Sequence, residues 1–112
     1  MPLFLFQGSY TAESMAALVK NPEDRSLHIQ SVVEKLGGKM VGFWLAFGEH
    51  DFYVVSDLPD AQSAAAFAMA TAASGGLHGF STTQLVTWSE AMAALRQAKS
   101  ISYRPPTKAA KG

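Results

Sequence analysis

The sequence predicts an α+β domain built on a four-stranded antiparallel sheet, and three observations lead to this. Apolar segments with the two-residue repeat of strands alternate with segments that have the apolar spacing of helices. Two glycine pairs, Gly37-Gly38 and Gly75-Gly76, each end a helical segment before a strand begins. A short polar turn at 48–51 joins two strands directly. The order strand, helix, strand, strand, helix, strand, followed by one more helix, predicts the ferredoxin-like βαββαβ fold.

In the first half, a strand is expected from Leu3 to Tyr10, which is rich in leucine, phenylalanine and tyrosine. Thr11 is suited to cap the helix that follows. The segment 21–24 restarts a helix, because it offers a capping asparagine, a proline for the first helical position and two acids near the positive end of the helix dipole. One face of this second helical segment is apolar, with the helical spacing of Ile29, Val32, Val33 and Leu36.

In the second half, strands are expected over residues 39–47 and 52–57, joined as a hairpin, and a fourth strand over 77–86. A helix over 61–74 begins after Pro59 with Asp60 as its cap. Thr87 and Glu90 form the pattern of a capping box, which predicts a last helix to about residue 98.

Length and charge limit the organisation of the chain. With 112 residues it is expected to form one domain, residues 1–98, followed by a basic tail, 99–112, that is predicted to be disordered. Five basic residues stand against nine acidic ones in 1–98, a net charge of −4, whereas the tail carries four basic residues and no acid. An acidic body argues against binding nucleic acid.

The chain contains no cysteine, which excludes a disulfide framework, a cysteine zinc site and a thiol nucleophile. This usage fits a cytoplasmic protein. The apolar start, residues 1–6, has neither the basic region nor the small-residue cleavage site of a signal peptide. No apolar stretch approaches the ~20 residues that span a bilayer, so no membrane partner is expected.

Two expected strands are apolar on both faces. In 39–47 the alternate positions include Phe43 on one side and Trp44 on the other, and in 3–10 both sides are again apolar. An antiparallel sheet with one wet face would alternate apolar and polar residues. Because helices cover one face of a ferredoxin-like sheet, the second face needs another cover. The share of only 16% charged residues in the chain agrees with a surface that is not meant to meet water.

A run without any charged residue extends from Ala61 to Ser89 and includes the alanine-rich third helix. Its small side chains allow close approach to the sheet but supply no charged outer face. Three interpretations stay open for the side of this helix that points away from the sheet: cover by a partner, cover by the C-terminal helix, or a simple alanine-rich surface in solvent.

The segment 48–60 (GEHDFYVVSDLPD), the preceding Leu36-Gly37-Gly38-Lys39, the aromatic strand before it and the opening 6–11 (FQGSYT) together resemble the GYD-domain family over roughly residues 3–95. This resemblance implies a ferredoxin-like protomer of the dimeric α/β-barrel superfamily, in which two protomers pack sheet face against sheet face, and a family of uncharacterised function. We therefore expect a homodimer whose second sheet face is covered by a second copy of the same sheet. Gly48 and Asp51 match the motif that names the family. His50 stands at the motif's tyrosine, so no role of that tyrosine is carried over.

Candidate site residues follow from the motif and from nearby aromatics: Gly48, Glu49, His50, Asp51, Tyr53, Trp44 and His78. An imidazole between two carboxylates could act as a general base, since histidine titrates near neutral pH. Equally, Asp51 could simply bond backbone N–H groups at a turn, with Gly48 supplying a permissive backbone. Trp44, Tyr53, Tyr10 and Phe43 could line an apolar cavity or be ordinary core residues.

Two functions stay open. The first is a dimer that binds or converts a small apolar molecule, which a cavity of several hundred Å³ beside His50 or His78 would favour. The second, which the resemblance implies through the stress-associated barrels of the same superfamily, is a non-catalytic assembly or binding module; an interior filled by aromatic residues would favour it. No catalytic residue is assigned and no cofactor is expected. His28, His50 and His78 lack the spacing of a metal site, so no metal is expected either.

Overall fold

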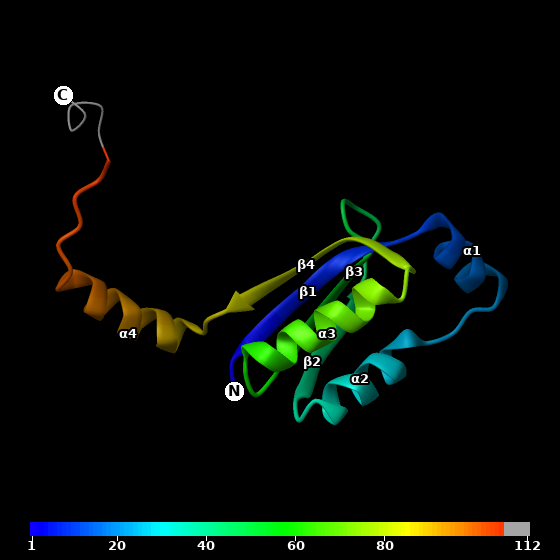
Figure 1. The fold of residues 1–112 in the computed structure, drawn as a ribbon, viewed down its shortest axis with the longest axis horizontal. Helices are drawn as coiled ribbons and strands as arrows, with labels where there is room; N and C mark the ends of the chain where they lie inside the picture. The colour runs from blue at the N-terminus through cyan, green and yellow to red at the C-terminus, as the bar shows by residue number, and fades with distance from the viewer. Residues whose placement is uncertain (107–112) are drawn as a thin grey trace.

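A computed structural model describes residues 1–106; the end of the expected tail, 107–112, lies outside the described residues. Four strands and four helices follow one another along the chain (Figure 1): β1 (Leu3–Tyr10), α1 (Ala12–Lys20), α2 (Arg25–Lys35), β2 (Lys39–Leu45), β3 (Phe52–Asp57), α3 (Ala61–Ala73), β4 (Leu77–Leu85) and α4 (Trp88–Lys99). This order agrees with the predicted sequence of elements.

The strands form one sheet in the order β2-β3-β1-β4, and every neighbouring pair is antiparallel. Two strands adjacent in sequence, β2 and β3, form the expected hairpin, while β1 lies between β3 and β4. This is the ferredoxin-like arrangement, and it confirms the predicted α+β fold. The register places Leu3 opposite both Asp57 and Leu85, so the same end of the sheet holds the start of β1 and the ends of β3 and β4.

Helices α2 and α3 cover one face of the sheet, here called the helix side (Figure 1). Alternate residues of β1 and β3 point to this side and are buried, and they form the core with α2, α3 and the start of the loop after β3. The buried apolar residues are Phe4, Phe6, Val33, Phe52, Val54, Leu58, Ala64 and Phe67. Burial of these side chains is the main stabilising contribution to the protomer.

The junction between α1 and α2 differs from the expectation. Asn21 ends α1 as its C-cap, and α2 begins only at Arg25, with Asp24 as its N-cap. The Asp24 carboxylate accepts a hydrogen bond from the Ser26 backbone N–H at 2.9 Å. Asn21 was therefore wrongly predicted to cap the second helix. Residues 21–24 stay outside both helices, and Asp24, whose carboxylate bonds the Ser26 N–H, caps the helix instead.

Strand β2 ends at Leu45 and not at residue 47 as predicted, because the chain leaves the ladder for the turn before β3. Its pairing with β3 also shifts between Met40 and Gly42, where one residue is inserted as a bulge. After this shift Phe43 lies opposite Val54 on the helix side, and Trp44 lies opposite Tyr53 on the other face. The bulge thus decides which of the two aromatic residues enters the core.

The second face of the sheet, here called the outer face, is covered by no helix of residues 1–106 (Figure 1). The register assigns to it six large apolar or aromatic side chains, namely Leu3, Leu5, Trp44, Tyr53, Val55 and Leu85, with Gln7, Ser81, Thr83 and Asp57 among them. Trp44 is 55% exposed. The predicted presence of apolar side chains on both faces of the sheet is confirmed.

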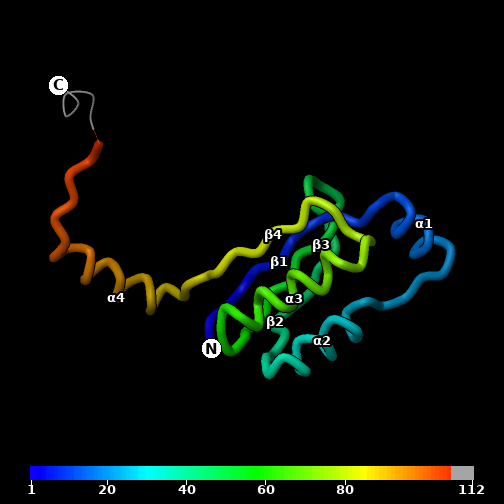
Figure 2. Tube along the Cα trace, viewed as in Figure 1, coloured from blue at the N-terminus to red at the C-terminus, as the bar shows by residue number. Residues whose placement is uncertain are grey.

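The last helix, α4, stands apart from the sheet and from α3 (Figure 2). It therefore does not cover the alanine-rich outer surface of α3, where Met69 is 69% exposed. Residues 100–106 continue beyond α4 without helix or strand. Within residues 1–106, each helix is too short or too polar to cross a bilayer.

We predict that Leu58→Ala lowers the free energy of unfolding by about 2–5 kcal/mol, because it removes a fully buried side chain and leaves a cavity. Leu27→Ala is the matched control, since Leu27 lies on α2 and is 69% exposed. Urea unfolding followed by circular dichroism measures both variants. Equal losses in the two variants would contradict the placement of the core.

Candidate functional site

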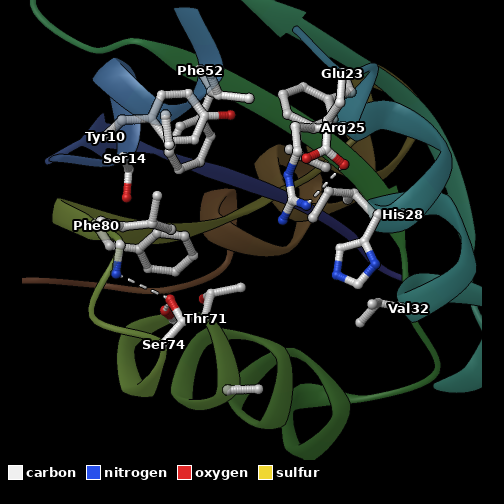
Figure 3. Close-up of a pocket in the computed structure, with 18 of the residues that line it drawn as sticks. Tyr10, Ser14, Glu23, Arg25, His28, Val32, Phe52, Thr71, Ser74 and Phe80 are labelled. Atoms are coloured by element: carbon white, nitrogen blue, oxygen red, sulfur yellow. Dashed lines mark hydrogen bonds and ion pairs between the residues drawn. The ribbon is translucent and has the colours of Figure 1, made fainter. Parts of the chain in front are cut away.

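A cavity of about 510 Å³ lies between α1, α2, α3 and the helix side of the sheet (Figure 3). Each of the three helices contributes to its wall: α1 with Leu18, α2 with Val32 and α3 with Ala70. A second hollow next to it shares Tyr10, Leu18, Glu23, Arg25 and Phe43 with the first. The two hollows are therefore continuous beside α1 and the start of α2.

Aromatic rings make up the sheet wall of the cavity. Phe52 is central to them, with ring centroids 5.4 Å from Tyr10, 6.3 Å from Phe43 and 6.1 Å from Phe80. Phe67 of α3 closes the far side and packs on Phe6. These contacts hold the rings in fixed orientations, so the cavity presents a stiff apolar wall.

Polar groups enter this apolar space mainly from α2. Arg25 and His28 lie side by side in Figure 3, and Glu23 precedes them in the chain. The Arg25 guanidinium is 3.5 Å from the Glu23 carboxylate, and both side chains are partly exposed. An exposed pair of this length contributes little to stability and leaves most donors of the guanidinium available to another acceptor.

Hydroxyl groups line the opposite wall, but they bond within their own segments. The Thr71 hydroxyl donates to the Phe67 and Ala68 carbonyl oxygens of its own helix. The Ser74 hydroxyl donates to the Thr71 carbonyl oxygen and accepts from the Gly76 N–H. The donors of Thr71 and Ser74 are thus already used, and the groups best placed to bind a polar ligand atom are Arg25, His28, the Tyr10 phenol and the Ser14 hydroxyl, which accepts from Thr11 Oγ1.

Tyr10 ends β1 with its ring in the cavity wall. Burial raises the pKa of its phenol; the nearby Arg25 charge opposes this and the Asp51 charge adds to it. A raised pKa keeps the phenol protonated through the neutral range, where it can donate a hydrogen bond. The backbone N–H of Tyr10 donates to Asp51 Oδ2 at 2.9 Å, so the motif aspartate fixes the position of this ring.

Asp51 joins three segments of chain. Besides the bond to Tyr10, its own N–H donates to the Gly8 carbonyl at 2.8 Å, and its carbonyl accepts from the Ala46 N–H at 2.7 Å. The loop before β3 is thereby tied to the end of β1. These bonds support the interpretation of Asp51 as a residue that shapes the turn.

The other motif residues lie away from the cavity wall. Glu49 is almost fully exposed, and its carboxylate is 3.9 Å from His50 Nε2. The His50 ring contacts Tyr53 edge to face at 6.0 Å between centroids. Since Tyr53 belongs to the outer face, His50 is placed beside that face. Gly48 lies in the open turn, where a Cβ atom would meet no other group.

Strand alternation also divides the aromatic candidates. Tyr10 and Phe43 line the cavity, as the cavity hypothesis expected, whereas Trp44 and Tyr53 point to the outer face and are not part of its wall. His78 is exposed at the start of β4, opposite Ser9, and does not line the cavity either. Among residues 1–106, no three histidine, aspartate or glutamate side chains are grouped as metal ligands would be.

Sequence reasoning did not single out Arg25 and His28 as cavity residues. Their signal is present in the chain: Arg25, His28, Ile29 and Val32 follow the spacing i, i+3, i+4, i+7 of one helix face. Two polar residues on an otherwise apolar face indicate either a helix edge or a polar contact within a cavity. The structure places both in the cavity wall.

The fold and cavity define a ferredoxin-like domain with an open pocket between its helices and its sheet. A family model described as the GYD domain matches residues 4–95, and the chain belongs to this family. Curated proteins include no match to the sequence. A solved structure with a similar chain path is a crystal structure of a MhuD mutant with two manganese protoporphyrin IX molecules bound per active site. That chain is 20% identical, with a TM-score of 0.43, and the match covers 78% of this chain and 94% of that one.

We predict that Asp51→Ala lowers the free energy of unfolding by about 1–3 kcal/mol, because the Tyr10 N–H loses a charged acceptor. Glu49→Ala is the control in the same turn, and we expect it to change stability by less than about 0.5 kcal/mol. Thermal and urea unfolding measure both. If Asp51→Ala is as stable as the control, Asp51 does not hold the end of β1.

Proposed function

We propose that the chain forms a homodimer through the outer faces of its sheets, and that each protomer binds a small, largely apolar molecule in its own cavity. The observation that carries the binding function is the cavity of about 510 Å³ with aromatic walls. Its size lies within the range of small-molecule sites in proteins, and its few polar groups are grouped on one side.

The wall supports a particular chemical class of ligand. Flat faces of Phe52, Phe43 and Phe80 suit an aromatic or branched apolar body. Arg25, with donors that the long contact to Glu23 leaves available, suits an acidic group at one end of that body. The proposed ligand is therefore an apolar acid smaller than the cavity.

Binding is supported better than chemical conversion. The carboxylate of Asp51 is occupied by the backbone of Tyr10, and His50 lies beside the outer face. A general base would have to lie within hydrogen-bond reach of a substrate in the cavity, so conversion would have to use His28 of the cavity wall and not the motif residues. The assembly module without a ligand remains the competing proposal, and the ligand experiment below separates the two.

The outer face supports the dimer. Its large apolar residues lie on all four strands of the sheet. Among the outer-face positions in the register, the charged residues are the pair Lys39 and Asp57 at one end. Exposed apolar patches of this kind on a small protein mark interaction surfaces. A second copy offers the same apolar surface, which a twofold axis brings into register with the first.

The ligand proposal is tested with 8-anilinonaphthalene-1-sulfonate, an aromatic acid whose fluorescence rises in apolar sites. We expect saturable binding of one molecule per protomer. Ala70→Trp fills the cavity and should weaken binding by about tenfold or more, since a bulky side chain there competes for the same volume. The matched control is Ala65→Trp, at an exposed position of α3 outside the cavity wall.

A second pair of variants tests the acidic end of the ligand. Arg25→Gln should weaken binding by roughly tenfold, the loss expected for a hydrogen bond to a charged group. Lys35→Gln, at the exposed end of the same helix, should leave it unchanged. Equal binding by wild type, Ala70→Trp and Ala65→Trp would contradict the cavity site and favour the assembly module.

The dimer is tested with Leu5→Asp, which places a charge at the centre of the outer face on the central strand β1. An unpaired charge is costly to bury, so we expect sedimentation velocity to give a monomer. Gln84→Asp is the control, an exposed strand position on the helix side of β4. A dimer as tight in Leu5→Asp as in the control would overturn the outer-face interface. Leu5→Thr, which keeps strand propensity, serves if Leu5→Asp does not fold.

A further inference from the structure

Helix α4 has an apolar stripe that its own protomer leaves uncovered. Trp88, Met92 and Leu95 follow the spacing i, i+4, i+7 and are 79%, 42% and 57% exposed. The opposite side of the helix carries Glu90 and Gln97. Apolar residues continue into the following segment with Ile101 and Tyr103, which are also largely exposed.

The helix is nevertheless well formed. Thr87 and Glu90 make a complete capping box, with hydrogen bonds of 3.1 and 2.8 Å, and two basic residues lie in the last turn. A 12-residue helix without tertiary contacts is marginal in water, because most helix stability comes from packing of an apolar face. The stripe therefore implies a surface against which it packs.

The extended shape of the chain shows that α4 does not pack on its own sheet or helices. The radius of gyration is 18.5 Å, against roughly 13 Å for a compact domain of this length. Figure 2 shows the cause, since β4 leads α4 away from the sheet and from the helix layer. A helix in this position can bury its apolar stripe only against another molecule.

We propose that α4 is an arm that packs on a second copy of this chain and extends the interface between the two sheets. This inference rests on the proposed dimer. Its first support is continuity with the outer face, because Leu85, the last residue of β4, lies on that face opposite Leu3. Only two residues, Val86 and Thr87, separate it from α4.

The same end of the sheet holds further exposed apolar side chains. The register brings the start of β1, the start of β2 and the end of β4 to this end. Met1, Val41 and Val86, at or next to these strand ends, are 66%, 56% and 63% exposed. A partner on the outer face would thus meet apolar side chains on β1 and β4 next to the arm, with the charged pair Lys39 and Asp57 on the other two strands of the same end.

The area of the sheet supplies a second argument. Four strands of six to nine residues present a face of roughly 500 Å², given about 3.3 Å per residue and about 4.8 Å between strands. Stable interfaces bury about 800 Å² on each partner. The arm with its tryptophan adds exposed apolar surface to that of the outer face.

Charge favours the same contact. Residues 1–87 carry four basic and eight acidic residues, a net charge of −4. Residues 88–106 carry three basic residues, Arg96, Lys99 and Arg104, against the single acid Glu90. An arm of positive charge is attracted to the acidic body of another copy, and salt weakens this contribution.

The test compares Leu95→Glu, on the apolar stripe, with Gln97→Glu, on the opposite side of the same helix turn. Both place one carboxylate near the helix C-terminus, so their effects on the helix itself match. Sedimentation equilibrium of the full chain should give a dimer dissociation constant at least about tenfold higher for Leu95→Glu than for wild type, and an unchanged constant for Gln97→Glu.

Tryptophan fluorescence gives an independent measurement, because the chain has two tryptophans, Trp44 and Trp88. In a Trp44→Phe variant the emission reports Trp88 alone, and sedimentation equilibrium first verifies that this variant dimerises, because Trp44 lies on the outer face. The proposal expects this emission to shift to the red on dilution through the dissociation constant, as the arm returns to water.

The outcomes separate the arm from the dimer. If wild type dimerises and Leu95→Glu dissociates no more readily than Gln97→Glu, with Trp88 emission independent of concentration, the arm proposal is overturned while the sheet interface stands. If wild type is a monomer at micromolar concentration, both fail together. Weaker dimerisation in both variants alike would contradict a contact specific to the stripe.

Discussion

Both faces of the sheet carry apolar side chains, and one protomer has helices for only one of them. This constraint organises the molecule. On the helix side, Phe6 and Val54 pack with α2 and α3 into the core. On the outer face, Leu5 and Val55 face solvent in the isolated chain, at a cost that scales with apolar area. The low share of charged residues in the sequence reflects this second apolar surface.

The motif turn and the cavity have different parts in this arrangement. The Asp51 carboxylate accepts from the Tyr10 N–H, and its backbone bonds Gly8 and Ala46. These bonds fix the end of β1. Tyr10 in turn presents its ring to the cavity. The motif aspartate therefore does not line the cavity but positions Tyr10, which does. The charged and imidazole groups of the cavity wall, Arg25 and His28, come from α2. His50 of the motif turn lies on the outer side, next to Tyr53.

Much of the fold could be predicted from sequence because local signals agree with it. The cap at Asp60, the capping box at Thr87 and the two glycine pairs all mark element ends that the structure contains. The bulge in β2 could not be predicted, since it depends on pairing with β3. Without it, the sequence does not show which of Phe43 and Trp44 points to the helices and which to the outer face. The cavity residues Arg25 and His28 needed the same tertiary information: a polar pair on a helix face indicates a cavity only once the sheet opposite is known.

The central claim is that the outer face of the sheet is covered by a second copy of the chain. The most direct measurement is the mass of the unmodified protein in solution, by sedimentation equilibrium at micromolar concentration and moderate salt. The account predicts about twice the chain mass of 12.0 kDa. A single species at the mass of one chain, folded and stable at these concentrations, would contradict it.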